Sequence, residues 1–158
     1  MTDRATHAPP ELSYVMELRV KVAAPMDVGN IAQGRRRVVP ILGGTFDGPD
    51  LRGVVLEGGA DWQIVRPDGF TILDTRYMLR TDAGQLVYIQ NAGVRHAAPE
   101  IMRRLLDGES VDPALVYFRT TPVFETAAHE LLWLTRSLFV GAGERYPGEV
   151  VIRVWRVE

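Results

Sequence analysis

The chain contains no cysteine, which excludes disulfides, thiolate metal sites and a cysteine nucleophile. Lys21 is the only lysine among the 18 basic residues, so Schiff-base chemistry would depend on one side chain that the strand pattern places in solvent. Only His96 and His129 lie outside the first ten residues, and two imidazoles are few for a transition-metal site. Glycine-rich phosphate-binding motifs are missing as well. We therefore expect neither a metal ion nor an organic cofactor.

Long apolar runs and an excess of one charge are also absent. No segment approaches the ~20 apolar residues that span a bilayer, and residues 1–10 lack the apolar core of a secretory signal. A formal net charge of −2 gives no electrostatic reason to bind nucleic acid or an anionic membrane. We therefore expect a cytoplasmic protein whose partner is a small organic molecule, with the oligomeric state open and a homo-oligomer allowed.

Alternation of apolar and polar residues, which is typical of half-buried strands, recurs along most of the chain. It is clearest over residues 12–22, and similar patterns joined by Gly, Pro and Asp turns predict eight further strands at 35–46, 51–57, 61–66, 70–81, 85–91, 114–121, 131–140 and 150–157. Pro99 and an apolar stripe predict one short helix that ends at Gly108, and residues 126–130 could form a helical turn.

These elements predict a mainly β fold. We expect residues 1–10 to be a disordered tail and residues 11–158 to form a single antiparallel β-barrel of about nine strands with one short helix. The closed barrel is favoured because it removes exposed sheet edges. A two-sheet β-sandwich is the alternative, since the strand count permits it equally well.

Charged residues inside predicted strands are the candidates for catalysis. Asp61 opens one strand beside a tryptophan, and Arg76 shares a strand face with Asp74, either as a surface pair or to orient an anionic or carbonyl ligand. Glu125 is either a solvated neighbour of a short helical turn or, packed by Phe124, a general acid or base. Asp61, Arg76 and Glu125 are therefore the predicted catalytic residues.

Five further side chains are the candidates for ligand binding. Arg119 lies on an apolar strand face, where it either extends to solvent at a barrel mouth or binds a carboxylate. Trp62 and Trp133 are either core residues or an aromatic wall for a ligand, to which Tyr77 and Tyr88 could contribute.

The order and spacing of several motifs resemble a known family. They are GGTFDG at 43–48, GGADW at 58–62, LDTRY at 73–77, YFRT at 117–120, FET at 124–126 and the Trp-Leu pair at 133–134. Together they resemble the domain-of-unknown-function family 3237 over nearly all of residues 12–157. The resemblance implies a small β-barrel similar in shape to allene oxide cyclase and dirigent proteins, which bind apolar or phenolic ligands and need no cofactor. No residue motif carries that chemistry over to this chain.

The leading hypothesis for function is a small-molecule-binding barrel that acts as a cofactor-independent isomerase, cyclase or lyase on a small carbonyl or aromatic metabolite. Arg76 and Arg119 would orient a carboxylate or enolate, and Asp61 or Glu125 would move a proton. The alternatives are a non-catalytic carrier or sensor, and a structural or assembly protein whose barrel is filled by side chains. A cavity of roughly 300 Å³ or more would favour the first two over the third.

Overall fold

The computed structural model describes residues 8–158, so most of the predicted tail, residues 1–7 with His7, lies outside the described part. Within residues 8–158 there are ten strands. They are β1 Leu12–Val22, β2 Met26–Ile31, β3 Gly34–Asp47, β4 Arg52–Val55, β5 Ala60–Val65, β6 Thr71–Thr81, β7 Leu86–His96, β8 Tyr117–Glu125, β9 Leu138–Tyr146 and β10 Glu149–Val157. The helical elements are α1 Pro99–Leu106, η1 Pro113–Leu115 and η2 His129–Thr135.

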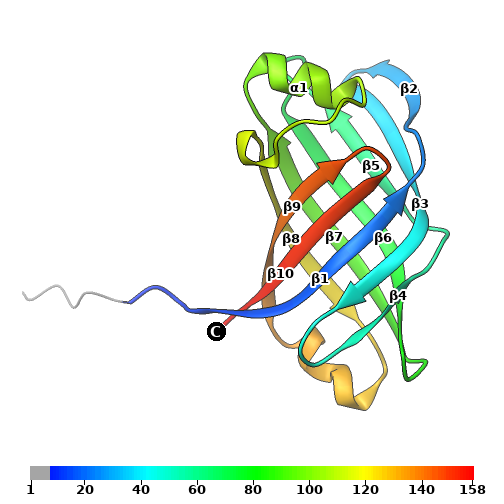
Figure 1. Cartoon of the computed structure of the whole chain (residues 1–158), viewed down its shortest axis with the longest axis vertical. Helices are drawn as coiled ribbons and strands as arrows, with labels where there is room; N and C mark the ends of the chain where they lie inside the picture. Colours follow the sequence, from blue (N-terminus) through cyan, green and yellow to red (C-terminus); the bar gives the residue numbers. More distant parts are fainter. Residues whose placement is uncertain (1–7) are drawn as a thin grey trace, which may run out of the picture.

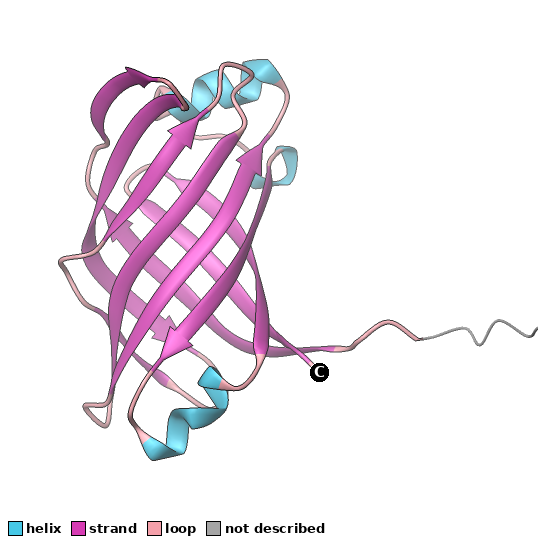
Figure 2. Cartoon of the chain, turned by 180° about the vertical axis from the view of Figure 1, so that it is seen from behind, coloured by secondary structure: helices cyan, strands magenta, loops and turns pink. Residues whose placement is uncertain are grey.

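The strands form one closed antiparallel barrel (Figures 1 and 2), as predicted, and not a sandwich. Each strand from β6 to β10 pairs with its neighbour in the chain, and β1 completes the circle by pairing with both β10 and β3. The short strands β4 and β5 follow one another between β3 and β6, so together they occupy a single place in the wall. In the same way β2 continues beyond β1 along the other side of β3.

Closure depends on a close approach between β1 and β3. Gly44 lies opposite Val20 in the register of these strands, and its φ of 143° is rarely adopted by residues with a side chain. A Cβ atom on Gly44 would also overlap the backbone carbonyl of Arg19. From the sequence, Gly43 and Gly44 allow either another backbone or a ligand to approach this strand, and the structure shows that the approach at Gly44 is made by the β1 backbone.

The end of the barrel that carries η2 is filled by apolar side chains. Fully or almost fully buried residues from most strands meet there, and Leu131 and Leu134 of η2 cover them. The main members of this packed end are Met16, Leu18, Phe46, Leu79, Val87, Ile89, Phe124, Phe139 and Val154.

The segment around η2 corrects one sequence prediction. Residues 131–140 were expected to form a strand, but residues up to Thr135 belong to the 3₁₀ helix η2, and β9 begins only at Leu138. The reason is that Leu131 and Leu134, three residues apart, both face the packed end, which a 3₁₀ helix allows. The strand β2 was not predicted, and β7 continues five residues beyond the predicted end at Asn91.

The helix α1 covers the opposite end of the barrel (Figure 1) and agrees with the prediction. Pro99 is its first residue, where the missing backbone N–H costs nothing. Met102 and Leu105 pack with Val111 in a small cluster that is separate from the main core. None of the helices in residues 8–158 has the length and apolar character needed to cross a bilayer.

The packed end should supply most of the stability. We expect Leu79→Ala to lower the free energy of unfolding by about 2–5 kcal/mol, because Leu79 is fully buried and its loss leaves a cavity. Val123→Ala, on an exposed side chain of the barrel wall, should change it by less than about 0.5 kcal/mol. Urea denaturation of both variants measures the difference, and equal effects would contradict this division of the barrel.

Candidate functional site

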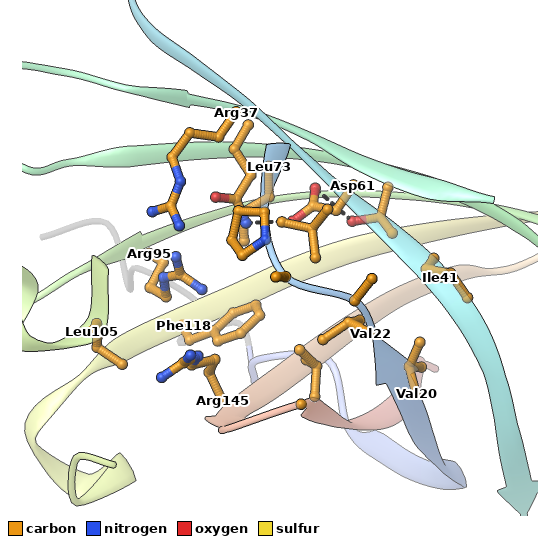
Figure 3. A pocket seen from close by; sticks show the side chains of 18 of the residues that line it. Val20, Val22, Arg37, Ile41, Asp61, Leu73, Arg95, Leu105, Phe118 and Arg145 are labelled. Atoms are coloured by element: carbon orange, nitrogen blue, oxygen red, sulfur yellow. Dashed lines mark hydrogen bonds between the residues drawn. The ribbon is translucent and has the colours of Figure 1, made fainter. Parts of the chain in front are cut away.

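The upper half of the barrel, next to α1, encloses a cavity of about 450 Å³ (Figure 3). Its apolar wall includes Val20, Ile41, Leu73, Phe118 and Ile152. The mouth is bordered on one side by residues 105–108 at the end of α1 and on the other by residues 23–25, between β1 and β2. The cavity lies within the range of roughly 300–1,000 Å³ that is usual for small-molecule sites, so a barrel filled throughout by side chains is not what the chain forms.

Asp61 at the start of β5 provides a carboxylate at the cavity wall. The Thr75 hydroxyl donates a hydrogen bond to its Oδ1 at 2.9 Å, and the Gln63 side-chain amide donates to its Oδ2 at 2.8 Å. Burial raises the pKa of Asp61, although both hydrogen bonds and the charge of Arg95 act in the opposite direction. Asp61 therefore takes up a proton more readily than an exposed aspartate.

Three arginines from different strands line the same cavity: Arg37 of β3, Arg95 of β7 and Arg145 of β9 (Figure 3). Arg37 and Arg95 are buried, with 7% and 6% of their surface exposed. Burial lowers the pKa of Arg95 to about 10, so the guanidinium stays charged at neutral pH. Within residues 8–158, no carboxylate lies within ion-pair distance of any of the three.

The contacts that these guanidiniums do make are with uncharged groups. Arg95 lies 5.7 Å from the centre of the Phe118 ring, and Arg145 donates a hydrogen bond to the backbone carbonyl of Glu109 at 2.8 Å. Asp107, which is exposed at the end of α1, is the second carboxylate at the lining, after Asp61. Positive charge is therefore in excess at the mouth end of the cavity.

Several polar groups at the wall have no hydrogen-bond partner among the described residues. They are Oε1 of Gln63, Oδ1 of Asn91, Nε of Arg95 and Oγ1 of Thr120, and all four side chains line the cavity. Unpartnered buried polar atoms are rare in folded proteins. Their concentration at one cavity indicates that a bound molecule or ordered water completes their hydrogen bonds. No group of three or more His, Asp or Glu side chains in residues 8–158 is placed to bind a metal ion.

The structure brings two of the predicted site residues together in this cavity, Asp61 and Tyr77. Tyr77 is buried on β6, on the same strand face as Thr75, and burial raises its pKa. Its hydroxyl therefore stays protonated at neutral pH.

The other predicted site residues do not line the cavity. Trp62, Arg76, Tyr88, Arg119 and Glu125 occupy the alternate positions of their strands and lie on the outer wall. Arg76 forms an ion pair with Asp74 at 3.3 Å, which is the surface pair that the sequence allows. Trp133 lies in η2 at the opposite end, with its ring 6.3 Å from that of Phe139. Of the predicted site residues, only Asp61 and Tyr77 therefore line this cavity.

Sequence reasoning missed the arginines and the amides of the cavity. Arg95 could have been found by continuing the alternation of β7 beyond Asn91, since inward positions there recur every second residue through Gly93 to Arg95. Arg37 stands in a run of three arginines, and nothing in the sequence marks which of them points inward. Arg145 follows two inward glycines, and one of these, Gly143, lies against the Phe118 ring, so that a Cβ there would come within 2.6 Å of it.

The chain is similar in sequence to known proteins. The family described as "Protein of unknown function (DUF3237)" matches residues 10–157. A UPF0311 protein of Rhodopseudomonas palustris is 42% identical over 147 residues, covering 93% of this chain and 96% of that protein. A UPF0311 protein of Clostridium acetobutylicum is 38% identical over 150 residues, covering 93% and 95%.

Solved structures share the fold. The crystal structure of a conserved protein of unknown function from Rhodopseudomonas palustris has a TM-score of 0.92 at 40% identity, covering 96% of this chain and 100% of that one. A β-barrel-like protein from Acinetobacter baumannii has a TM-score of 0.85 at 38% identity, covering 98% and 100%. An enzyme from Penicillium herquei has a TM-score of 0.73 at 16% identity, covering 100% of both chains, and so shares the fold alone.

The raised pKa of Asp61 makes stability depend on pH. Between the ordinary carboxyl value of about 4 and the higher value in the barrel, the folded protein binds more protons than the unfolded chain, so stability falls as pH rises. Asp61→Asn removes this loss, so we expect the stability of the variant relative to that of the wild type to increase as the pH rises from 4 to 7. Melting temperatures across this range measure the difference. Asp74→Asn on the outer wall is the matched control, and a parallel pH dependence of wild type and Asp61→Asn would contradict the expectation.

Proposed function

This chain belongs to the DUF3237 family, whose function is unknown, and we propose that its barrel cavity binds a small organic anion and moves a proton on it. The arginines hold the anionic group, and Asp61 is the general acid or base. Such chemistry is that of a cofactor-independent isomerase, cyclase or lyase acting on a carbonyl-bearing or aromatic substrate.

The observation that carries the proposal is the set of three cavity arginines without a carboxylate partner. Placing a guanidinium inside a barrel costs free energy unless an anion or strong hydrogen-bond acceptors compensate it. Within residues 8–158, Arg95 has no carboxylate within ion-pair distance and its Nε has no hydrogen-bond acceptor, although the charge of Asp61 acts on it from farther away. A carboxylate or enolate ligand would supply the missing charge and would be bound by bidentate hydrogen bonds.

Asp61 supports proton transfer as the second half of the proposal. It is held in a fixed orientation by Thr75 and Gln63, and its pKa is raised by burial, which brings it closer to the pH at which general acids and bases are most effective. The apolar wall formed by Leu73 and Phe118 positions the carbon framework of the ligand against it. A carboxylate of this kind accepts a proton from a carbon next to a carbonyl and returns it at another position.

The second candidate is a carrier or sensor that binds the same anion without converting it. It is favoured by the hydrogen bonds of Asp61, because both carboxylate oxygens already have a donor from the protein. In that function Asp61 would serve only as a fixed polar group of the wall.

Phenylpyruvate distinguishes the two candidates, because it is a small aromatic anion whose methylene protons exchange through an enolate. In D₂O the wild-type protein should bind it and accelerate exchange of these protons, as followed by proton NMR. Asp61→Asn should lower the protein-dependent exchange rate about a hundredfold or more while the Kd changes less than about threefold. Binding without any accelerated exchange would identify the carrier, and absence of binding at millimolar phenylpyruvate would contradict the anion site.

Arg95→Met tests whether the buried charge serves binding and not folding. We expect this variant to be as stable as the wild type or more stable by about 1 kcal/mol, because a buried charge without a partner is replaced by an apolar side chain of similar length. Its Kd for phenylpyruvate should rise about tenfold or more. Arg119→Met on the outer wall is the matched control and should leave the Kd unchanged. A large loss of stability in Arg95→Met would contradict the assignment.

A further inference from the structure

We infer that the natural ligand of the cavity is a hydroxylated carboxylate, with its carboxylate and its hydroxyl at opposite ends of an apolar body the size of two or three rings. This inference rests on the proposed function and adds the class of substrate. It follows from the different hydrogen-bonding character of the two ends of the cavity and from their separation along the barrel.

The deep end of the polar wall is formed by one row of side chains on adjacent strands. Asp61 of β5 lies opposite Thr75 of β6, and Thr75 lies opposite Asn91 of β7. Because side chains directly opposite each other point to the same face of the sheet, this row faces the cavity. Gln63 lies one inward position closer to α1, opposite Arg37.

The deep row offers unpartnered hydrogen-bond acceptors together with donors. The Asp61 carboxylate accepts only, and the carbonyl oxygens of Gln63 and Asn91 have no donor among the described residues. The Asn91 amide also carries N–H donors, and the Thr120 hydroxyl, which lies one inward position closer to α1 and opposite Gly93, has an oxygen without a partner and both donates and accepts. Leaving buried acceptors unsatisfied is costly, so the complementary ligand group has to donate, and a hydroxyl is the simplest group that donates and also accepts.

The opposite end of the cavity has a surplus of donors. Arg95 follows Asn91 by four residues along β7, which corresponds to about 13 Å of extended strand towards α1. Arg37 and Arg145 reach the cavity from β3 and β9 at the same end (Figure 3). Guanidiniums donate hydrogen bonds and never accept them, so an anionic oxygen group is what this end binds.

The space between the two ends is apolar and limited in size. Leu73 and Phe118 form part of its wall. A dry cavity of roughly 150 Å³ accommodates one benzene ring, and this cavity of about 450 Å³ is three times larger. The body between carboxylate and hydroxyl therefore has room for two or three rings, and the ligand lies with its carboxylate towards α1 and its hydroxyl towards Asp61.

Three naphthalene probes test the inference by isothermal titration calorimetry: 6-hydroxy-2-naphthoate has both groups, 2-naphthoate lacks the hydroxyl and 2-naphthol lacks the carboxylate. We expect 6-hydroxy-2-naphthoate to bind the wild-type protein about tenfold or more tightly than either of the others, because 2-naphthol loses the hydrogen bonds to the guanidiniums and 2-naphthoate leaves the buried acceptors of the deep row without a donor. The comparison uses the intact protein and does not depend on any substitution.

Variants then assign each effect to one end. Arg95→Met should remove the advantage of 6-hydroxy-2-naphthoate over 2-naphthol and keep its advantage over 2-naphthoate. Asn91→Leu should do the reverse, and Thr120→Val serves the same purpose if Asn91→Leu does not fold, as judged by circular dichroism. Arg119→Met and Asp74→Asn, both on the outer wall, are the matched controls and should change neither ratio.

The outcomes separate this inference from the function on which it rests. Equal affinities for 2-naphthoate and 6-hydroxy-2-naphthoate would show that ordered water satisfies the deep row, which overturns the hydroxyl assignment and leaves the anion site intact. Equal affinities for 2-naphthol and 6-hydroxy-2-naphthoate would overturn the anion site itself. Absence of binding of all three probes would contradict both.

Discussion

The pairing of β1 with both β10 and β3 is the constraint on which the remaining structure depends. It turns a sheet into a closed wall, so every strand has one enclosed face and one face in solvent. The approach of β1 to β3 is tight enough to require glycine at position 44. Once the wall is closed, alternate residues of each strand face the interior. The position of a residue in this alternation therefore decides whether its side chain points towards the cavity. Asp61 therefore faces inward and Trp62 faces outward, although they are neighbours in the chain.

One half of the barrel provides most of the stability, and the other half contains the candidate site. The end near η2 is packed by aliphatic and aromatic side chains, which provide the favourable burial that any fold requires. The end near α1 leaves space and contains charged and unpartnered polar groups, each of which is unfavourable for folding. Local violations of the packing rules are typical of functional sites, where binding compensates them. The same barrel can tolerate them because its other half is filled.

The strands of the barrel wall can be predicted from the sequence better than the side chains that line its interior. Strand β1 is predicted to the residue because its alternation is long and Pro25 follows it, whereas β2 has only six residues and its alternation is interrupted at Gly29 and Asn30. On β6, the polar residue Thr75 and the charged residues Asp74 and Arg76 occupy opposite faces, and only closure of the barrel decides which face is inside. Because Asp74 and Arg76 are charged, the sequence favours this pair as candidates for a site, although both lie on the outer wall. Arg95 is missed because a charged residue near a strand end usually marks a loop, and only the register with β6 and β8 shows that it points inward.

The small core beneath α1 has a consequence for the exchange of molecules with solvent. Met102, Leu105 and Val111 form a cluster of their own, and of the partly buried residues of 8–158 that pack against it, only Val116 also packs against the main core. Opening at α1 therefore disturbs few contacts, and its free energy is a fraction of that of global unfolding. A molecule that leaves through the mouth would accordingly pass beside one helix of eight residues, whose local fluctuations can widen the passage while the hydrogen-bonded wall stays intact.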